Sequence, residues 1–455
     1  MAKPTPISGF PEWSPPQRMI EQYVLARIRR TFELYGFAPL ETRAVEPLDQ
    51  LLRKGDTSKE VYLLRRLQAD DRSGPPGEAS RAGSVAGTDE GELGLHFDLT
   101  VPFARYVLEN AGKLHFPFRR YQIQKAWRGE RPQEGRYREF TQADIDVVDR
   151  DTLPFHYEAE LPVVVADALS ALPIPPIRIL VNNRKVCEGY YRGLGIGDPA
   201  AALRAVDKLD KIGPARVAAL LSETAGATEA QAKACLALAE VSAPDASFAD
   251  TVRALGVQHP LLDEGLAELV QVMEANPGAP LVADLKIARG LDYYTGTVYE
   301  AQMIGYERYG SVCSGGRYDN LASSGTDRYP GVGMSIGVTR ILGLLFGHGA
   351  LTVSRQVPTC VLVALPAEAD RPAADRTAAA LRARGIATEV SPSAAKYGRQ
   401  IRHAERRGIP FVWFPGEPDE VKDIRSGEQA PADAATWEPP ADDLHPRVEG
   451  KETNP

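Results

Sequence analysis

The feature that most constrains the fold is a pair of strand-like segments, FRRYQIQKAWR and REFTQADIDVV, separated by a short polar loop that contains a glycine. This pattern predicts two antiparallel strands joined as a hairpin. Every second side chain of a strand lies on the same face. We therefore expect Arg128, Glu130 and the loop residue Arg136 to converge over one pocket.

The hairpin is also unusually basic. Residues 115–138 hold seven Lys or Arg and two Glu. Arginines gathered in this way match the fork geometry of phosphate groups. A solvated basic face without a ligand is the alternative, and the charge pattern alone leaves both open. Tyr121, Trp127 and Tyr137, interleaved with the arginines, favour a binding surface.

Composition narrows the class of protein. The chain has 455 residues, enough for two or three domains, with 43% hydrophobic and 25% charged residues as in ordinary globular proteins. Its first residues lack the apolar segment of a secretory signal, and no apolar run is long enough to predict a transmembrane helix. The net charge of −8 speaks only weakly against nucleic-acid binding, which needs no more than a local basic surface.

The cysteines are scattered and show no CxxC pair: Cys187, Cys235, Cys313 and Cys360. This spacing argues against a disulfide framework or a zinc site, so no protein-ligated metal is expected. It is typical of a protein of the reducing cytoplasm.

Residues 14–36 are predicted to form a helix, with Ser14 as N-cap and Gly36 after the last turn. Its apolar face repeats every four residues, at Ile20, Val24, Ile28 and Phe32. Short strand-like pieces follow: FAPLETRAVE, EVYLLRRL and LGLHFDLT. The stretch 66–92 between the last two is rich in Gly, Ser, Ala and Asp and is predicted to be a disordered loop.

The character of the chain changes twice more. Residues 187–277 are rich in Ala, Leu and Glu at helical spacing, which predicts a helical insertion. Strand signals return at Leu281. A β-α-β-α-β alternation over 356–430 predicts a separate α/β domain. Residues 431–455 are acidic and contain several prolines, and a mobile tail is expected there.

Three further stretches are ambiguous when taken singly. KIARGLDYYTGTVYE places Arg289, Tyr293 and Tyr294 before an alternating strand, either as an anchor or as the wall of a site. In SGGRYDN, the pair Gly315-Gly316 is most simply a tight turn. GVGMSIGVTR fits neither the dinucleotide-binding nor the P-loop pattern. Small residues on such a buried strand could let a ligand approach the backbone.

Together and in this order the motifs are far more specific, and over residues 10–430 the chain resembles the histidyl-tRNA synthetases, which are class II aminoacyl-tRNA synthetases. The basic hairpin is similar to the motif 2 of that family, and GVGMSIGVTRIL is similar to its motif 3. ARGLDYYTGTVYE and SVCSGGRYDNL resemble the two histidine-specific signatures. The C-terminal α/β unit is similar to the anticodon-binding domain.

The resemblance implies an α+β fold. An antiparallel-sheet catalytic domain would span 1–186 and 278–348, with the helical insertion at 187–277 and the anticodon-binding domain at 356–430. It also implies a homodimer whose substrates are L-histidine, ATP with Mg²⁺ and tRNA-His. Histidine and ATP would give histidyl-adenylate, from which the histidyl group would pass to the tRNA.

The resemblance also implies roles for single residues. Histidine would be held by Asp98, Thr100, Gln142, Asp146, Tyr293, Tyr294 and Tyr318. The ATP phosphates and adenine would be held by Arg128, Glu130, Arg136 and Arg340. Arg289, with Arg128 and Arg340, would be catalytic by stabilising charge at the α-phosphate. An arginine face near 396–407 would contact tRNA through Arg399, Arg402 and Arg406.

Two residues depart from the family pattern. Arg43 stands where a proline is usual, in the motif 1 region expected at the dimer interface. Thr339 replaces the acidic residue that commonly precedes the motif 3 arginine, here Arg340. A paralogue that regulates ATP phosphoribosyltransferase is the main rival, but it typically lacks the C-terminal domain. An inactive RNA-binding relative would have lost the arginines that bind the phosphates. Arg128, Arg289 and Arg340 are all present here.

Overall fold

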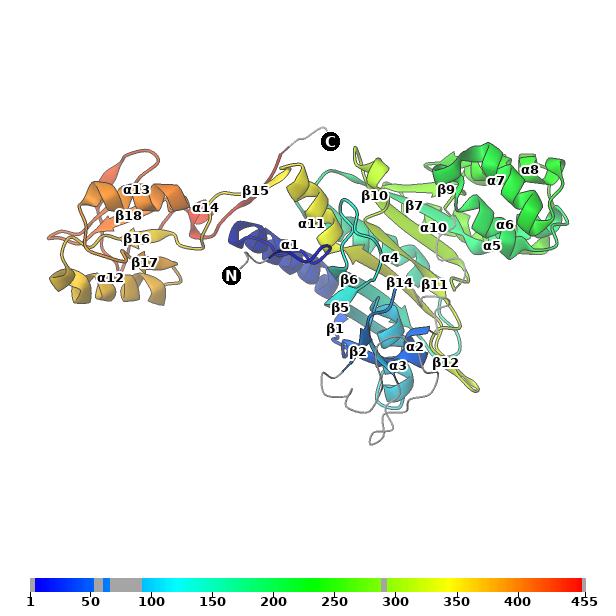
Figure 1. The fold of residues 1–455 in the computed structure, drawn as a ribbon, viewed down its shortest axis with the longest axis horizontal. Coiled ribbons are helices and arrows are strands. Elements are labelled where there is room, and N and C mark those ends of the chain that lie inside the picture. Colours follow the sequence, from blue (N-terminus) through cyan, green and yellow to red (C-terminus); the bar gives the residue numbers. More distant parts are fainter. Residues whose placement is uncertain (1–4, 53–59, 66–91, 288–292, 452–455) are drawn as a thin grey trace. The chain divides into compact units, whose positions relative to one another are not determined.

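The computed structural model describes residues 5–52, 60–65, 92–287 and 293–451 (Figure 1). Most of the predicted 66–92 loop and the predicted catalytic Arg289 therefore lie outside the described residues. The chain forms two compact units. Leu25–Leu344 and the residues up to Pro11 build the first, and Glu12–Val24 and the residues from Leu345 onward build the second.

The predicted N-terminal helix is confirmed as α1, Pro15–Leu34. The Ser14 backbone N–H and hydroxyl both donate to Gln17 Oε1, and Gly36 follows the helix with a positive φ of 76°. A positive φ suits glycine, which has no Cβ to clash. The predicted apolar stripe is buried, with at most 2% exposure at each of its four residues.

A nine-stranded sheet dominates the first unit, with strand order β1-β5-β6-β14-β11-β10-β7-β9-β8. The strands are β1 Ala38–Pro39, β5 Phe118–Trp127, β6 Glu139–Val148, β7 Ile177–Asn183, β8 Ser242–Ala243, β9 Leu281–Asp284, β10 Thr297–Met303, β11 Cys313–Tyr318 and β14 Gly331–Gly337. The five central strands β5-β6-β14-β11-β10 are antiparallel throughout. The antiparallel catalytic sheet expected from the resemblance is thus present.

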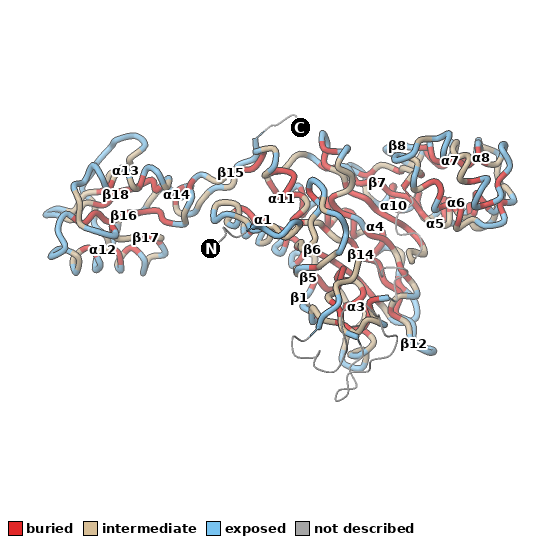
Figure 2. The backbone as a smooth tube through the Cα atoms, viewed as in Figure 1, coloured by how far each residue is buried: buried red, intermediate tan, exposed pale blue. Residues whose placement is uncertain are grey.

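The two faces of this sheet differ in chemistry. On β6, Ala143, Ile145 and Val147 point to one face and are fully buried. Gln142, Asp144 and Asp146 alternate with them and point to the other face. Figure 2 shows buried residues along the strands of the sheet. A buried sheet face that carries amide and carboxylate groups needs polar partners, so this face is where a ligand site is expected.

The remaining elements of the first unit flank the sheet. A small sheet of order β2-β4-β3 uses β2 Val45–Pro47, β4 Leu93–Leu95 and β3 Leu63–Leu64, beside the helices α2 Leu48–Leu51 and α3 Thr100–Asn110. Helix α4, His156–Ser170, packs against β14 and β7. A 3-10 turn at Glu307–Tyr309 and a hairpin of β12 Ser323–Ser324 and β13 Asp327–Arg328 complete this part.

The helical character predicted for 187–277 is confirmed. This part of the chain holds α5 Arg184–Gly193, α6 Pro199–Val206, α7 Leu209–Ala225, α8 Glu229–Ala239, α9 Phe248–Ala254 and α10 Pro260–Glu274. Helices α5 and α10 pack so closely that a Cβ on Gly189 would lie 2.3 Å from the Leu262 nitrogen. These helices belong to the same compact unit as the large sheet.

The predicted C-terminal α/β domain is also confirmed. Its sheet has the order β17-β16-β18-β19-β20, parallel between the first three strands and antiparallel between the others. The bounds are β16 Val361–Val363, β17 Thr388–Val390, β18 Phe411–Phe414, β19 Glu420–Asp423 and β20 Gln429–Pro431. Helices α12, Arg371–Ala383, and α13, Tyr397–Arg407, cover opposite faces of the sheet (Figure 1).

The mobile tail predicted for 431–455 is wrong for residues 431–451. Helix α14, Ala441–Leu444, and strand β21, Val448–Gly450, form there, and β21 pairs with β15, Leu351–Val353. Trp437 packs against the α12 side of the domain sheet. The acidic composition misled the prediction because one acid, Asp443, is largely buried and paired with Arg425.

The four cysteines are free and buried. Among residues 5–52, 60–65, 92–287 and 293–451, no helix combines the length and the apolar character needed to cross a membrane.

Candidate functional site

The predicted hairpin is the scaffold of the site. Strands β5 and β6 pair antiparallel from Phe118 opposite Val148 to Trp127 opposite Glu139. The loop between them closes with a bridge between Gln133 and Arg136, beside Gly135 at φ 68°. This geometry places the basic loop at the end of the sheet face that carries the polar side chains.

One row of polar residues crosses the sheet on that face. Residues directly opposite one another on paired strands share a face. Asp144 lies opposite Ser335, Ser335 opposite Ser314, and Ser314 opposite Glu300. Four strands that are distant in sequence therefore contribute to one polar surface.

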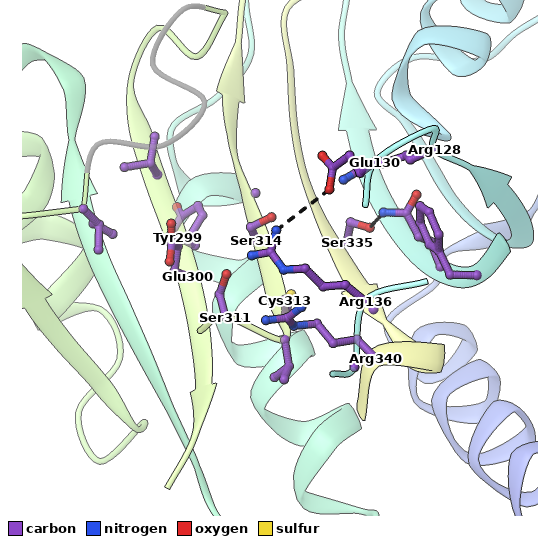
Figure 3. Close-up of a pocket in the computed structure, with 18 of the residues that line it drawn as sticks. Arg128, Glu130, Arg136, Tyr299, Glu300, Ser311, Cys313, Ser314, Ser335 and Arg340 are labelled. Atoms are coloured by element: carbon purple, nitrogen blue, oxygen red, sulfur yellow. Dashed lines mark hydrogen bonds and ion pairs between the residues drawn. The ribbon is translucent and has the colours of Figure 1, made fainter. Parts of the chain in front are cut away.

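A cavity of about 310 Å³ opens above this row (Figure 3). It brings together seven of the predicted site residues, namely Arg128, Glu130, Arg136, Gln142, Tyr293, Tyr294 and Arg340. Glu300, Ser314 and Ser335 also line it. Figure 3 shows the Arg136 and Arg340 side chains extending in the same direction towards the strand of Cys313 and Ser314.

A smaller hollow of about 20 Å³ lies next to this cavity and shares Tyr294, Ser314 and Ser335 with it. Three more predicted residues, Thr100, Asp146 and Tyr318, line the hollow. Asp98 lines neither space. Its Oδ1 instead accepts the Val101 backbone N–H at 3.1 Å. Val101 lies in the first turn of α3, which begins at Thr100.

The arginines of the cavity are held along their length. Arg128 Nε donates to the Phe97 carbonyl at 3.0 Å, and its guanidinium lies 5.2 Å from the centre of the Phe140 ring. Arg136 lies 4.0 Å from Glu130. Arg340 comes from the first turn of α11, Val338–Gly347, and its Nη2 donates to the Tyr309 carbonyl. Positioned guanidinium groups can neutralise phosphate charge without proton loss.

The hollow is built around a buried ion pair. Asp146 Oδ2 lies 2.6 Å from Arg120 Nη2, and both side chains are almost fully buried. The Tyr318 hydroxyl donates to the other carboxylate oxygen of Asp146 at 2.8 Å. Burial and the nearby Asp146 charge raise the pKa of Tyr318 well above its usual value, so the phenol stays a hydrogen-bond donor.

Asp144 is the main site residue that the sequence prediction missed. It is 2% exposed, and burial raises its pKa to about 7, against the opposing effect of the Arg120 charge. Ser335 donates a hydrogen bond to Asp144, and Gln142 Nε2 donates to Ser335 Oγ at 2.7 Å. The period-two alternation of Gln142, Asp144 and Asp146 is the signal that could have found it.

Glycines make room for these side chains. Gly315 and Gly316 lie on β11, so the tight turn predicted for them is wrong. A Cβ on Gly316 would lie 2.9 Å from the Tyr294 ring, and one on Gly331 would lie 2.5 Å from the Tyr318 ring. The small residues therefore admit neighbouring aromatic side chains to the sheet surface.

Gly333 offers a direct test of this packing. A Cβ there would lie 2.0 Å from Asp146 Oδ1, so Gly333→Ala should displace that carboxylate. We expect the substitution to raise the KM for histidine, the substrate that the family resemblance implies, at least about tenfold, as for one lost hydrogen bond to a charged group. Steady-state kinetics will measure this. Gly112→Ala is the matched control, since nothing lies within 4 Å of its added Cβ, and an equal effect there would refute the argument.

The two departures from the family pattern have structural partners. The Thr339 hydroxyl accepts the Thr141 backbone N–H at 2.7 Å, so it ties α11 to β6 where an acid would be usual. Arg43 Nη2 lies 3.2 Å from Glu46, which is itself held by Arg105 at 2.6 Å. Among the described residues, no group of three or more His, Cys, Asp or Glu side chains is placed to hold a metal ion.

An antiparallel sheet, a basic hairpin over its polar face and an arginine in the first turn of α11 are the features of one class of protein. The chain is a class II aminoacyl-tRNA synthetase. The family model described as Histidyl-tRNA synthetase matches residues 78–341, and the Anticodon binding domain model matches residues 359–431.

Whole-length comparisons narrow the class to one family. The chain is 57% identical to the Histidine–tRNA ligase of Micrococcus luteus, over 98% of this chain and 99% of the relative. It is 56% identical to that of Cutibacterium acnes, over 99% and 100%. The crystal structure of histidyl-tRNA synthetase from Nostoc sp. PCC 7120 matches with a TM-score of 0.82 and 32% identity, over 95% of this chain and 98% of that one. The chain belongs to the histidyl-tRNA synthetase family.

Proposed function

We propose that this chain joins L-histidine to tRNA-His in two steps, through a histidyl-adenylate intermediate. The observation that carries the proposal is the cavity in which Arg128, Arg136 and Arg340 lie beside an acidic hollow. Cationic and acidic groups in adjoining spaces suit a reaction between a nucleoside triphosphate and an amino acid.

The arginines serve the first step. When the histidine carboxylate attacks the α-phosphate of ATP, negative charge develops at phosphorus and on the leaving pyrophosphate. Preorganised guanidinium groups stabilise this charge, which is usually the largest contribution that a protein makes to such a reaction. We infer that Arg128 and Arg340 contact the phosphates and that Arg136 and Glu130 help to seat the nucleotide.

The hollow serves recognition of histidine. Arg120 neutralises Asp146, while Asp98 and Asp144 add negative charge around the same space. An excess of carboxylates attracts the substrate ammonium group. Tyr318 and Tyr294, both with a raised pKa because of burial, can bond the imidazole as neutral phenols. A site that hydrogen-bonds its substrate rejects analogues that lack those groups.

ATP would enter as its Mg²⁺ complex, because Mg²⁺ in such sites is bound by one or two carboxylates together with the phosphates. Glu130 and Glu300 are the carboxylates that line the cavity. The proposal includes a homodimer and a cytoplasmic location, both typical of the family.

ATP–pyrophosphate exchange with each amino acid in turn tests the proposal. We expect exchange with L-histidine only. An enzyme preparation that is folded but shows no histidine-dependent exchange would exclude the proposed function.

The regulatory-paralogue alternative is not favoured. The relatives at 56–57% identity that span the whole chain carry the name Histidine–tRNA ligase. The C-terminal domain that the rival typically lacks is present at residues 359–431. Transfer of histidine to tRNA-His by the same preparation distinguishes the two.

The arginine face of α13 is proposed to contact tRNA. Arg399, Arg402 and Arg406 are exposed on this helix at spacings of three and four residues, while Arg407 pairs with Glu389 at 2.5 Å. Replacing the three exposed arginines with glutamine should raise the KM for tRNA about tenfold or more and flatten its salt dependence, because phosphate contacts release counterions. ATP–pyrophosphate exchange should not change. Arg376→Gln and Arg382→Gln on α12 form the comparison pair, and equal effects would argue against a specific face.

A further inference from the structure

Three side chains on neighbouring strands form a chain of hydrogen bonds that reaches the cavity. Ser335 on β14 lies directly opposite Asp144 on β6 and donates its hydroxyl hydrogen to Asp144 Oδ1. Gln142, two residues before Asp144 on the same face, donates from Nε2 to Ser335 Oγ at 2.7 Å. Both Gln142 and Ser335 line the cavity.

The direction of these bonds follows from the charge of one group. An ionised carboxylate only accepts hydrogen bonds, so the Ser335 hydroxyl must donate its single hydrogen to Asp144. Ser335 can then only accept from Gln142, which turns the amide nitrogen of Gln142 towards Ser335. The other end of the amide, Oε1, is buried and has no hydrogen-bond partner among the described residues. A buried acceptor of this kind needs a donor.

We propose that Asp144 and Ser335 are positioning residues that hold the Gln142 amide with its carbonyl oxygen towards the amino-acid substrate. This inference rests on the proposed function and on the family resemblance, which implies that Gln142 helps to hold histidine. We place the ammonium group of histidine at the Gln142 amide. An ammonium group only donates hydrogen bonds, so a carbonyl oxygen binds it and an NH₂ group repels it. Neither Asp144 nor Ser335 needs to touch the substrate to have this effect.

Protonation of Asp144 should reverse the direction of these hydrogen bonds. A protonated carboxyl can donate to Ser335, whose hydrogen then becomes available to Gln142 Oε1, and the amide turns its NH₂ group to the cavity. The charged groups that act on Asp144 are Arg120 on β5, Asp146 on β6 and Asp98 before α3, and Cys313 on β11 lies within its field. Burial raises the pKa of Asp144 to about 7, so the reversal falls within an accessible pH range.

The test is Ser335→Ala in the full-length enzyme, with ATP–pyrophosphate exchange measured between pH 6 and 8.5. At pH 8.5 we expect the KM for histidine to rise about tenfold, as for one weakened hydrogen bond to a charged group. The KM for ATP and kcat should stay within about twofold. The ratio of the two histidine KM values, variant over wild type, should fall towards one at pH 6, because the wild type loses the correct amide orientation there. Titration of the substrate imidazole affects both enzymes and cancels in the ratio.

A second readout separates positioning from general damage. Imidazolepropionate is histidine without the amino group, so its Ki as a competitive inhibitor should be the same in Ser335→Ala and wild type. Ser335→Thr keeps the hydroxyl and should restore the histidine KM, and Ser323→Ala, in the exposed β12–β13 hairpin, is the matched control. If Ser335→Ala fails to fold, Asp144→Asn is used instead and should show the same pH trend.

The outcomes are distinct. A KM ratio that does not change with pH, or a Ki for imidazolepropionate that rises with the histidine KM, overturns the positioning role. Absence of histidine-dependent exchange in the wild-type enzyme would count against the proposed function, and it would leave no substrate for Gln142 to orient.

Discussion

Replacing Arg128 with alanine is expected to lower the rate of histidine-dependent ATP–pyrophosphate exchange by about 10²–10³, the usual cost of removing one group that stabilises transition-state charge. Arg128 lies in the cavity beside Glu130, Arg136 and Arg340. Its Nε bond to the Phe97 carbonyl and the Phe140 ring fix the side chain before substrate arrives. A guanidinium that is already in place needs no reorganisation when charge develops, so its loss should appear in kcat as well as in KM.

Two further variants separate charge from packing at this position. Arg128→Lys keeps a cation but has no Nε to bond the Phe97 carbonyl and no planar fork, so it should recover only part of the activity. Arg178→Ala is the matched control, because Arg178 is an exposed arginine on β7 of the same sheet. Near-normal kcat with only a raised KM for histidine in Arg128→Ala would show that Arg128 does not meet the developing charge.

Much of the fold could be predicted because it is encoded locally. The β5–β6 hairpin alternates over ten-residue strands, and helix α1 repeats apolar residues every four positions. The C-terminal alternation of strands and helices was likewise visible. In each case neighbouring residues carry the pattern, so no knowledge of distant contacts was needed.

The parts that escaped prediction depend on register between distant strands. Ser335 meets Asp144 only because β14 pairs with β6, across 191 residues of sequence. The need for glycine at position 333 depends on the same pairing of β14 with β6. It places the Asp146 carboxylate where a side chain on residue 333 would lie. A local pattern predicts that a strand forms, but it does not predict which residue of another strand lies opposite.

Composition misled the prediction at the C-terminus, and the structure suggests a strong test there. Residues 432–451, which we name the C-terminal clasp, close over the α12 side of the second unit. The Trp437 ring packs edge-on to Phe411 at 5.3 Å and to Trp413 at 5.7 Å. Arg384 donates to backbone carbonyls of the clasp, including that of Trp437. These contacts lie on the same face of the sheet as α12.

Buried charge makes the clasp more than a hydrophobic cover. Arg355 is 3% exposed, and its guanidinium donates to the Asp443 and Leu444 carbonyls at 2.7 and 3.1 Å. Arg425 donates to both carboxylate oxygens of Asp443, at 2.8 and 2.7 Å. Without the clasp, Arg355 would keep the Pro358 carbonyl but lose these two acceptors, and Arg425 would keep Asp423 but lose Asp443. Removing part of the partners of an ionic group that the fold buries is destabilising.

Ending the chain after Pro431 is therefore expected to lower the unfolding temperature of the second unit by roughly 10–20 °C. Trp437→Ala alone should cost about 2–3 kcal/mol, because a large aromatic contact is lost from a partly buried site. For a domain of this size that free energy corresponds to a shift of about 10 °C or more. Calorimetry of the full chain will show it, and tRNA charging at the higher temperature should fall while ATP–pyrophosphate exchange persists.

Two adjacent aspartates provide the internal control for the clasp. Asp443 is largely buried against Arg425, whereas the side chain of Asp442 is 82% exposed and lies 3.6 Å from Arg447. Hydrogen bonds from Arg425 hold the pKa of Asp443 below its usual value, so the pair stabilises the fold at neutral pH and is lost as the pH falls through that lowered pKa. Asp443→Asn should thus destabilise the unit at pH 7, and progressively less as the pH falls below about 4, the ordinary pKa of an aspartate. Asp442→Asn should have little effect at either pH. Equal effects of the two substitutions would mean that the acidic residues act only through net charge, as expected for a mobile tail.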